Sequence, residues 1–130
     1  MTNKELFQLA VKASENSYSP YSGFHVGAAL VAGSGKVYTG CNIENASYSM
    51  TICAERTAIF KAVSEGEREI KAIAVAGSAG DDFSVPCTPC GACLQVMSEF
   101  GGDDLVVILS DGEHCLNDFL PLRFTDKNLK

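Results

Sequence analysis

Three cysteines in two segments have the spacing of metal ligands. Cys90 and Cys93 lie three positions apart, and Cys53 lies in a separate segment. Residues three apart on a helix have Cβ atoms about 5 to 6 Å apart, and two sulfurs on one tetrahedral zinc ion lie just under about 4 Å apart. The pair therefore fits one metal ion. Cys53 as a third thiolate would leave a fourth position for water, which is typical of catalytic zinc.

A fourth cysteine, Cys87, leaves a second choice of ligand pair open, because Cys87 and Cys90 are also three positions apart. Pro89 disfavours helical geometry for the residue that precedes it, which favours a loop conformation around Cys87. The chain from Cys90 onward can instead enter a helix directly. We therefore predict that Cys53, Cys90 and Cys93 are the metal ligands.

Two charged residues that follow Cys53 could assist a metal-dependent reaction. Zinc with three thiolates carries a net negative charge, which disfavours ionisation of a bound water. Arg56 could compensate for that charge by donating hydrogen bonds to sulfur, and helix N-termini would act in the same direction. Glu55 could accept a proton from water and deliver it to a ring nitrogen and a leaving amine. In isolation, Glu55 would be an ordinary first-turn glutamate, and Arg56 a solvated surface cation.

The segments around these residues predict a layered α/β domain. Residues 26–32 and 36–43 flank a glycine-containing turn and predict an antiparallel hairpin. Residues 70–76 and 105–109 predict two further strands. The expected helices are an N-terminal helix with a capping box at Thr2 and Glu5, residues 52–63, residues 91–100 and residues 115–120. The expected fold is a mixed sheet of about five strands flanked by helices, in a single domain of residues 1–130.

The composition narrows the possible classes of protein. The chain has 130 residues, of which 46% are hydrophobic and 20% charged, and it is long enough to form a core without disulfide bonds. Ten basic and 16 acidic residues give a net charge of −6, which argues against nucleic-acid and anionic-membrane partners. The sequence contains neither a signal-peptide pattern nor a membrane-spanning apolar stretch. We therefore expect a cytoplasmic protein with reduced thiols that binds a small molecule.

Four motifs together resemble the small, homotetrameric class of zinc-dependent cytidine deaminases. They are Phe24-x-Val26-Gly27-Ala28-Ala29, Asn42-Ile43-Glu44-Asn45-Ala46, Cys53-Ala54-Glu55-Arg56-Thr57-Ala58 and Pro89-Cys90-Gly91-Ala92-Cys93-x-Gln95. The motifs occur in family order over nearly the whole chain. A single motif could arise by chance, but four in register identify a family resemblance.

The resemblance implies an activity and a set of site residues. The implied reaction is hydrolytic deamination of cytidine and 2′-deoxycytidine to uridine and 2′-deoxyuridine, with release of ammonia, as part of pyrimidine salvage. It implies one Zn²⁺ per chain on the three cysteines and Glu55 as the catalytic proton carrier. The implied substrate-binding residues are Phe24 at the pyrimidine, Asn42 and Glu44 at the ribose hydroxyls, and Ala46, Tyr48, Ala54 and Phe124. It also implies a homotetramer with shared pockets, in which Ala46 and Tyr48 come from one neighbour and Phe124 from another.

Two positions depart from the pattern of the family that the chain resembles. His25 stands where the family usually has proline, and Leu94 stands where it usually has arginine. Leu94 removes one possible cation, so Arg56 would carry more of the charge compensation. We expect His25 to be a hydrogen-bonded structural histidine rather than a metal ligand.

Two other functions remain open from the sequence. One is a structural-zinc or redox-thiol module, in which the closely spaced Cys87, Cys90 and Cys93 exchange partners. That function would leave Glu55, Asn42 and Glu44 without a role. The other is a related deaminase that acts on a nucleoside antibiotic or on RNA, and the acidic net charge argues against RNA.

Overall fold

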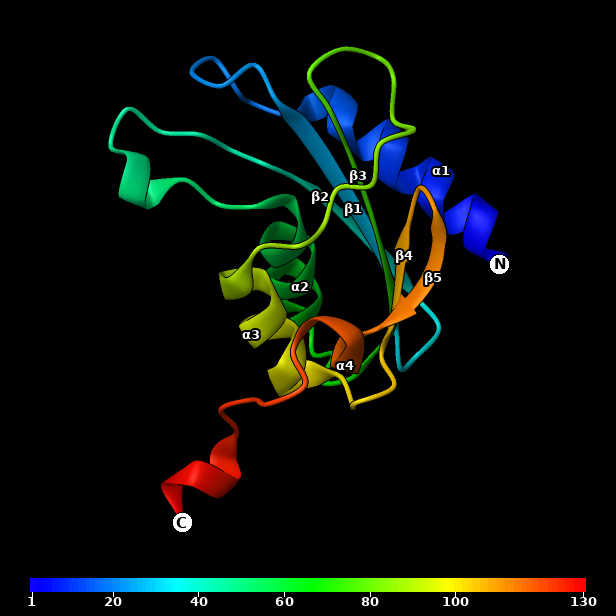
Figure 1. Ribbon diagram of the computed structural model, residues 1–130, viewed down its shortest axis with the longest axis vertical. Coiled ribbons are helices and arrows are strands. Elements are labelled where there is room, and N and C mark those ends of the chain that lie inside the picture. Colours follow the sequence, from blue (N-terminus) through cyan, green and yellow to red (C-terminus); the bar gives the residue numbers. More distant parts are fainter.

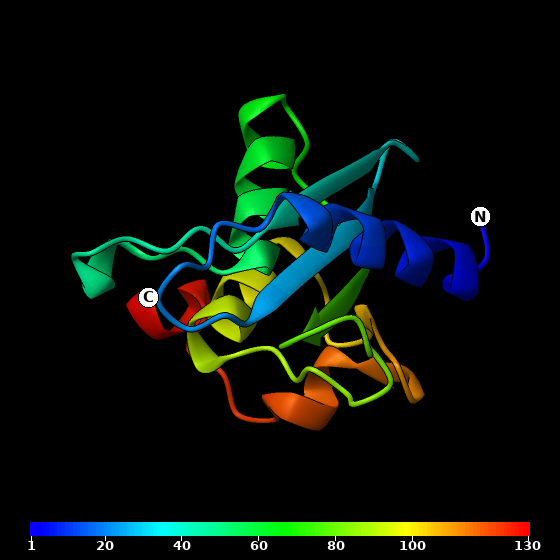
Figure 2. The same cartoon turned by 90° about the horizontal axis from the view of Figure 1, so that it is seen from above.

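The computed structural model describes all 130 residues and has one five-stranded sheet between two layers of helices (Figures 1 and 2). The strands are β1 (His25–Ala32), β2 (Val37–Cys41), β3 (Ile70–Ser78), β4 (Val106–Leu109) and β5 (Gly112–Cys115), in the order β2-β1-β3-β4-β5. Only β3 and β4 pair in parallel, and every other neighbouring pair is antiparallel. The predicted mixed sheet of about five strands, flanked by helices, is confirmed.

Helices cover both faces of this sheet. They are α1 (Asn3–Ala13), α2 (Ala54–Ser64), α3 (Gly91–Phe100) and the short α4 (Leu116–Phe119), with 3₁₀ turns at Ser14–Asn16, Tyr48–Met50 and Asp126–Leu129. The helix α1 begins at the predicted capping box, where Thr2 accepts a hydrogen bond from the backbone N–H of Glu5 and the Glu5 side chain accepts one from that of Thr2. The helices α2 and α3 lie on the opposite face of the sheet from α1 (Figure 2).

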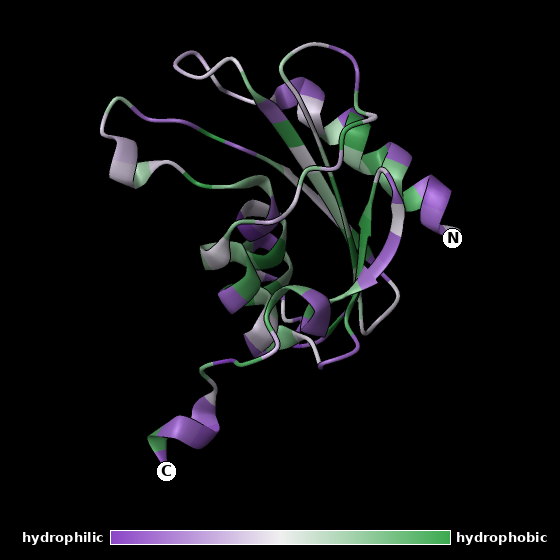
Figure 3. Ribbon diagram, in the orientation of Figure 1, coloured by the Kyte–Doolittle hydropathy of each residue, from purple (hydrophilic) through white to green (hydrophobic).

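The two faces of the sheet bury different side chains because residues alternate along each strand. Ile73 and Val75 of β3 pack in the larger core with α2, α3 and α4, whereas Ala74 and Ala76 pack in a smaller core with α1. In Figure 3 hydrophobic colour marks the inner strands of the sheet and parts of the helices that cover it. The larger core fixes α2 and α3 on one face of the sheet.

Two glycines allow the helices to approach the sheet closely. A Cβ atom added to Gly27 in β1 would lie 1.8 Å from the carbonyl oxygen of Ala10 in α1. One added to Gly40 in β2 would lie 2.5 Å from the backbone nitrogen of Ala58 in α2. Both distances are far below van der Waals contact, so α1 and α2 can occupy these positions only because the residues beneath them lack side chains.

The structure differs from the sequence prediction at several boundaries and at one strand. The helix expected over residues 52–63 is Ala54–Ser64, and the strand expected over 36–43 is the shorter Val37–Cys41. The strand β5 was not located from the sequence, because its residues, Gly112–Cys115, are mostly polar and lack alternation. It is an edge strand that turns back on β4, so it does not need two buried faces.

Two segments extend away from the layered part of the molecule (Figure 1). One is the connection from β2 to α2, which carries the 3₁₀ turn Tyr48–Met50, and the other is the C-terminal segment that ends in Asp126–Leu129. Each presents an aromatic side chain to solvent, with Tyr48 74% and Phe124 59% exposed. No helix in the structure has both the length and the apolar character needed to cross a membrane.

Candidate active site

The sulfurs of Cys53, Cys90 and Cys93 lie together, as predicted. The Cys53 and Cys90 sulfurs are 3.7 Å apart, the Cys90 and Cys93 sulfurs are 3.5 Å apart, and all three lie within 4.8 Å of one another. Tetrahedral zinc with sulfur ligands at about 2.3 Å requires sulfur separations just under about 4 Å. The three side chains therefore fit one zinc ion with only small adjustments.

The starts of two helices place these sulfurs. Cys53 is the N-cap residue of α2 and Cys90 is the N-cap residue of α3, and neither side chain makes a capping hydrogen bond to its helix. Cys93 lies in the first turn of α3 and is fully buried. Each N-cap thiol is thus free to bind a metal, and the positive ends of two helix dipoles point toward the cluster.

Arg56, in the first turn of α2, contacts the three-sulfur cluster. Its Nη2 donates a hydrogen bond to the Cys53 sulfur at 3.3 Å, and its Nε is buried without a hydrogen-bond partner. Hydrogen bonds from Cys93 and Arg56 lower the pKa of Cys53 to about 5, whereas the hydrogen bond to Cys53 and burial raise the pKa of Cys93. Hydrogen bonds to the sulfurs of Cys53 and Cys93 raise the pKa of Arg56. A cation is therefore fixed beside a sulfur that favours the thiolate form.

Glu55 is a buried carboxylate at the edge of this cluster. It is only 4% exposed, and burial raises its pKa to about 7, with a further contribution from the negative charge of Cys53. It lines a hollow of about 200 Å³ together with Cys53, Ala54, Cys90 and other residues, here called the inner pocket. A carboxyl group with a pKa near neutrality can both accept and donate a proton.

Cys87 lines the inner pocket but is not part of the three-sulfur group. Burial and the nearby charge of Glu55 raise its pKa to about 11, so its thiol is protonated at neutral pH. The predicted choice of Cys90 and Cys93 over Cys87 and Cys90 therefore agrees with the geometry. Leu94, which stands where the family usually has arginine, is buried in the larger core and brings no charge to the cluster.

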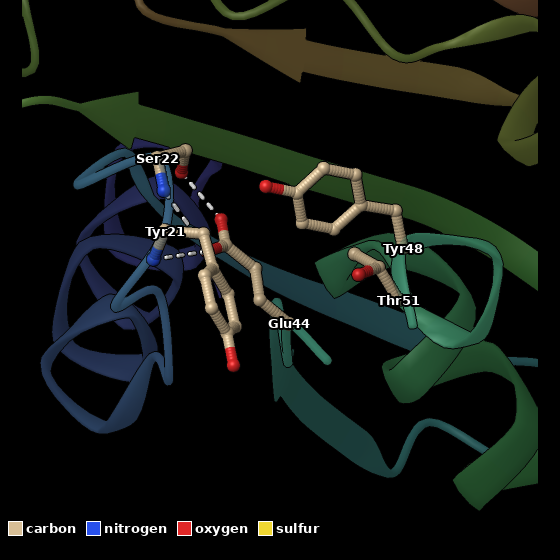
Figure 4. Close-up of a pocket in the computed structure, with 5 residues that line it drawn as sticks. All are labelled: Tyr21, Ser22, Glu44, Tyr48 and Thr51. Atoms are coloured by element: carbon tan, nitrogen blue, oxygen red, sulfur yellow. Dashed lines mark hydrogen bonds between the residues drawn. The ribbon is translucent and has the colours of Figure 1, made fainter. Parts of the chain in front are cut away.

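The structure has a second hollow, here called the outer pocket (Figure 4). It has a volume of about 400 Å³ and is lined by Tyr21, Ser22, Glu44, Tyr48 and Thr51. Thr51 lines both pockets, so the two hollows are neighbours. The rings of Tyr21 and Tyr48 meet edge to face, with their centroids 5.8 Å apart.

Glu44 is held against the loop that precedes β1. Its Oε1 accepts hydrogen bonds from the backbone N–H groups of Tyr21 and Ser22, and its Oε2 accepts one from the Ser22 hydroxyl (Figure 4). The hydroxyl and the two backbone donors lower the pKa of Glu44. The carboxylate is thus ionised at neutral pH, and Oε2 retains capacity to accept a hydrogen bond from a ligand.

Asn42 is buried, with 9% of its surface exposed, and lines the inner pocket. Its side chain bonds to the backbone of Phe24 and Val26 and to the Ser17 hydroxyl. One Nδ2 hydrogen has no partner within the protein, so Asn42 can donate one hydrogen bond to a ligand.

Phe24 is not among the residues that line the inner pocket, and its ring lies against Gly77, which leaves room for it. A Cβ atom at Gly77 would lie 2.9 Å from the Phe24 ring and 2.7 Å from the Cys87 sulfur. The end of β3 therefore supports both the aromatic ring and the loop that leads to Cys90. The sequence did not single out Gly77.

Three of the predicted substrate-binding residues do not lie at the sulfur cluster of the same chain. Ala46 and Tyr48 are exposed on the connection between β2 and α2, although Tyr48 lines the outer pocket. Phe124 is exposed on the C-terminal segment, where its carbonyl oxygen accepts a hydrogen bond from Gln95 of α3. Their predicted contributions to a neighbouring subunit remain predictions.

Comparison with known proteins identifies the family. Residues 1–109 match the family model described as the cytidine and deoxycytidylate deaminase zinc-binding region. The chain belongs to this family. It is 46% identical over 134 residues to the cytidine deaminase of Halalkalibacterium halodurans, and the alignment covers 99% of this chain and 98% of the relative. It is 52% identical over 111 residues to the cytidine deaminase of Sporosarcina psychrophila, and that alignment covers 85% of this chain and 79% of the relative.

Solved structures of family members have the same architecture. The cytidine deaminase of Burkholderia pseudomallei superimposes with a TM-score of 0.85 at 46% identity, over 95% of this chain and all of the other. That of Mycobacterium tuberculosis gives a TM-score of 0.87 at 38% identity, over 96% of this chain and 98% of the other. The predicted layered fold of the cytidine deaminase family is therefore confirmed.

Family membership decides how the sulfur cluster is interpreted. The matched region of the deaminase family is a zinc-binding one, and it includes Cys53, Cys90 and Cys93. The predicted zinc cofactor is confirmed by the family match and by the group of three sulfurs. The deaminase relatives do not favour the redox-thiol module or a deaminase that acts on a nucleoside antibiotic. Phe124 lies beyond the region of the chain that matches the deaminase model.

Three serines that were not predicted from the sequence hold Asn42, His25 and Glu44 in place. Ser17, Ser19 and Ser22 lie in the loop that precedes β1, and their hydroxyls contact Asn42, His25 and Glu44, respectively. The one available signal was the high serine content of residues 17–22. Serine hydroxyls in loops commonly bond to nearby polar groups, but the sequence does not show which groups will be near.

Proposed function

We propose that this protein catalyses the hydrolysis of cytidine and 2′-deoxycytidine to uridine and 2′-deoxyuridine, with release of ammonia. The observation that supports this function most strongly is the buried Glu55 beside three converging sulfurs, in a pocket that also contains Asn42. The relatives named cytidine deaminase also support it. A cytosine ring in the inner pocket would be near both the metal ligands and Glu55.

Zinc, when bound by the three cysteines, lowers the pKa of water and polarises it for attack. Glu55 then carries the protons. As a carboxylate it takes one proton from water while the water oxygen bonds to C4, and it delivers that proton to N3. It next transfers the remaining hydroxyl proton to the amine nitrogen. The bond from C4 to the amine breaks, ammonia leaves, and the C4 carbonyl of uridine forms.

The position of Glu55 suits both directions of proton transfer. A pKa near 7 keeps the cost of protonating and deprotonating this group small at neutral pH. Arg56 would offset the negative charge of the thiolates and so favour the ionised form of the attacking water. Both residues lie in the first turn of α2, so one helix supports the proton carrier and the compensating cation.

Asn42 and Glu44 are the proposed ribose ligands. Asn42 has one free N–H donor and Glu44 has a carboxylate oxygen that can accept. A hydroxyl group both accepts and donates a hydrogen bond, so these two side chains are complementary to one ribose hydroxyl. Selection for a nucleoside over free cytosine would follow from this pair.

We further propose that the protein is a homotetramer with shared pockets. The exposed Tyr48 and Phe124 lie on segments that extend away from the layers, where another subunit could bury them (Figure 1). Tyr48 and Ala46 would complete the pocket of one neighbour and Phe124 that of another. Large exposed aromatic side chains on extended segments are typical of association surfaces.

Residues 1–130 are proposed to act as a single domain in the cytoplasm. One continuous sheet connects both ends of the described chain, which supports one domain. All six cysteines are free in the structure, which is compatible with a reducing compartment. A small-molecule substrate requires no nucleic-acid or membrane partner.

The direct test is turnover of cytidine by the purified protein before and after removal of zinc. We expect about one zinc ion per chain, formation of uridine and ammonia in equal amounts, loss of turnover with chelation and recovery on addition of zinc. Zinc-loaded protein that binds cytidine but releases no ammonia would refute the proposed function.

A further inference from the structure

The orientation of the Asn42 amide is fixed by the backbone. Its Oδ1 accepts a hydrogen bond from the Val26 N–H at 3.0 Å, and its Nδ2 donates to the Phe24 carbonyl oxygen at 2.9 Å. The first contact needs an acceptor and the second needs a donor, so the oxygen and nitrogen cannot be exchanged. Ser17 Oγ lies 2.5 Å from the same Oδ1. Because a carboxamide oxygen cannot donate, the Ser17 hydroxyl hydrogen must point at Asn42.

Two more contacts lead from Ser17 to His25. Ser17 Oγ lies 3.2 Å from Ser19 Oγ, which in turn lies 2.8 Å from Nδ1 of His25. Each hydroxyl has a single hydrogen. Since the Ser17 hydrogen is used at Asn42, the hydrogen between the two serines must come from Ser19. The contact between Ser19 and His25 is then a hydrogen bond only if Nδ1 carries the hydrogen.

We propose that His25 is a positioning residue that starts a one-way chain of hydrogen bonds, from His25 Nδ1–H through Ser19 and Ser17 to Asn42 Oδ1. The opposite direction, with Ser19 donating to Nδ1, leaves the contact between Ser17 and Ser19 without a hydrogen. Only the proposed direction satisfies all three contacts together.

The chain of hydrogen bonds determines whether the Asn42 side chain can donate to a ligand or accept from it. With Ser17 and Val26 both donating to Oδ1, the acceptor capacity of Asn42 is filled, and only one N–H remains free. Asn42 is therefore a donor only, and Glu44 is an acceptor only. This part of the inference rests on the proposed function, because it takes the ligand to be a nucleoside with a hydroxyl between the two side chains.

Because Ser19 is buried, it depends on its hydrogen bond from His25. Ser19 is only 7% exposed and Asn42 only 9%. His25 lines a different hollow, of about 310 Å³, beside Glu15 and Asp81. The chain of hydrogen bonds thus runs from His25 in that hollow to Asn42 in the inner pocket. Loss of the His25 donor leaves a buried hydroxyl with fewer partners, and water cannot readily reach Ser19 to replace it.

Nitrogen-15 NMR of the zinc-loaded protein tests the direction of the chain without any substrate. The protein has two histidines, so ring signals can be assigned with one His25→Phe variant. At about pH 8 we expect the hydrogen of the His25 ring to be on Nδ1 rather than on Nε2. His114 is the internal control, because its Nε2 faces the acceptor-only Asp111 at 2.8 Å and must carry the hydrogen there. An unprotonated Nδ1 on His25 would overturn the proposal.

Steady-state kinetics with cytidine test the effect on Asn42. His25→Phe keeps a ring but removes the donor, and we expect KM to rise about 3- to 10-fold while kcat changes less than about twofold. His25→Asn restores an N–H near the Nδ1 position and should keep KM near the wild-type value. Equal KM values for wild type and His25→Phe, or equal increases in both variants, would contradict the proposal.

These two experiments separate the inference from the proposed function. If zinc-loaded wild-type protein fails to deaminate cytidine, the proposed function fails, whereas the NMR result still decides the direction of the chain. If His25→Phe does not fold, the tautomer of wild-type His25 remains decisive, with signals assigned through a Ser19→Ala variant instead. If the protein deaminates cytidine but Nδ1 of His25 carries no hydrogen, the proposed function stands and only the proposed chain of hydrogen bonds is refuted.

Discussion

The inner and outer pockets are built from different kinds of structure. The inner pocket lies at the N-termini of α2 and α3, which are fixed on the sheet by the larger core, and its Glu55 is buried. The outer pocket is built from loop residues, and Tyr48 on its wall is 74% exposed. Proton transfer needs groups held in fixed positions, whereas substrate selection can use loops that adjust or that a neighbouring subunit completes.

This contrast predicts different kinetic effects for the two pockets. Changes to Cys53, Cys90 or Glu55 in the inner pocket should lower kcat or remove zinc, because these groups act on the reacting atoms or hold the metal. Changes in the outer pocket should mainly raise KM.

Replacement of one sulfur ligand should abolish both zinc binding and activity. Cys90→Ser is suitable because Cys90 is exposed, so loss of the thiol leaves no buried cavity. We expect less than about a tenth of the wild-type zinc content and a decrease in kcat of more than about 10⁴-fold. Cys87→Ser is the matched control and should keep its zinc, measured by metal analysis of the purified protein. Zinc loss from Cys87→Ser, or zinc retention by Cys90→Ser, would contradict the ligand assignment.

Replacement of Arg56 should lower kcat with a smaller effect on zinc. Arg56→Gln removes a charged donor to the Cys53 sulfur, and bonds to charged groups contribute about 1.5 to 3 kcal/mol. We expect kcat for cytidine to fall about 10- to 100-fold. Arg68→Gln is the matched control, because Arg68 bonds to the carbonyl groups of Val63 and Glu67 rather than to the cluster. An increase in KM alone would show that Arg56 does not act on the reaction centre.

Replacement of Glu44 should affect binding rather than turnover. Glu44→Gln removes the negative charge that is proposed to accept from a ribose hydroxyl, so we expect KM for cytidine to rise about 10-fold and kcat to change less than about twofold. Glu67→Gln is a close control, since Glu67 also accepts from a serine hydroxyl and has a lowered pKa. A large loss of kcat in Glu44→Gln would contradict the proposed division between the pockets.

The smallest predicted effect concerns acid stability. The Ser22 hydroxyl and two backbone donors lower the pKa of Glu44 from its ordinary value of 4.5, so ionised Glu44 stabilises the folded state. That contribution is complete above the unfolded-state pKa and is lost as the pH falls through the lower folded-state pKa. The difference in Tm between wild type and Glu44→Gln should therefore shrink from about pH 6 to about pH 3. A difference that widens toward acid would show that the sign is wrong.

The sequence was most informative where local spacing determines structure. The N-terminal capping box, the α3 helix and the proximity of Cys90 to Cys93 depend on residues close in the chain, and all were predicted correctly. The convergence of Cys53 with that pair was predicted from the need for a third thiolate, and the charge argument and the resemblance supported it. Long-range geometry of this kind follows from the packing of two helices on one sheet, which periodicity alone does not specify.

Other features could not be derived from the sequence because they depend on tertiary contacts. The strand β5 pairs only through its edge with β4 and has little apolar pattern. The hydrogen bonds of Ser17 and Ser19 cross from one loop to another, and no local rule selects their partners. Gly77 is informative only once Phe24 and Cys87 are seen against it.

The most direct test of the central claim is a comparison of Glu55→Gln with wild type for zinc content and cytidine turnover in the same preparations. We expect Glu55→Gln to keep about one zinc ion per chain and to lose about 10²- to 10⁴-fold in kcat. Glu99→Gln, an exposed change on α3, should match wild type in both measurements. Near-normal turnover by zinc-loaded Glu55→Gln would contradict the role of Glu55 as the proton carrier.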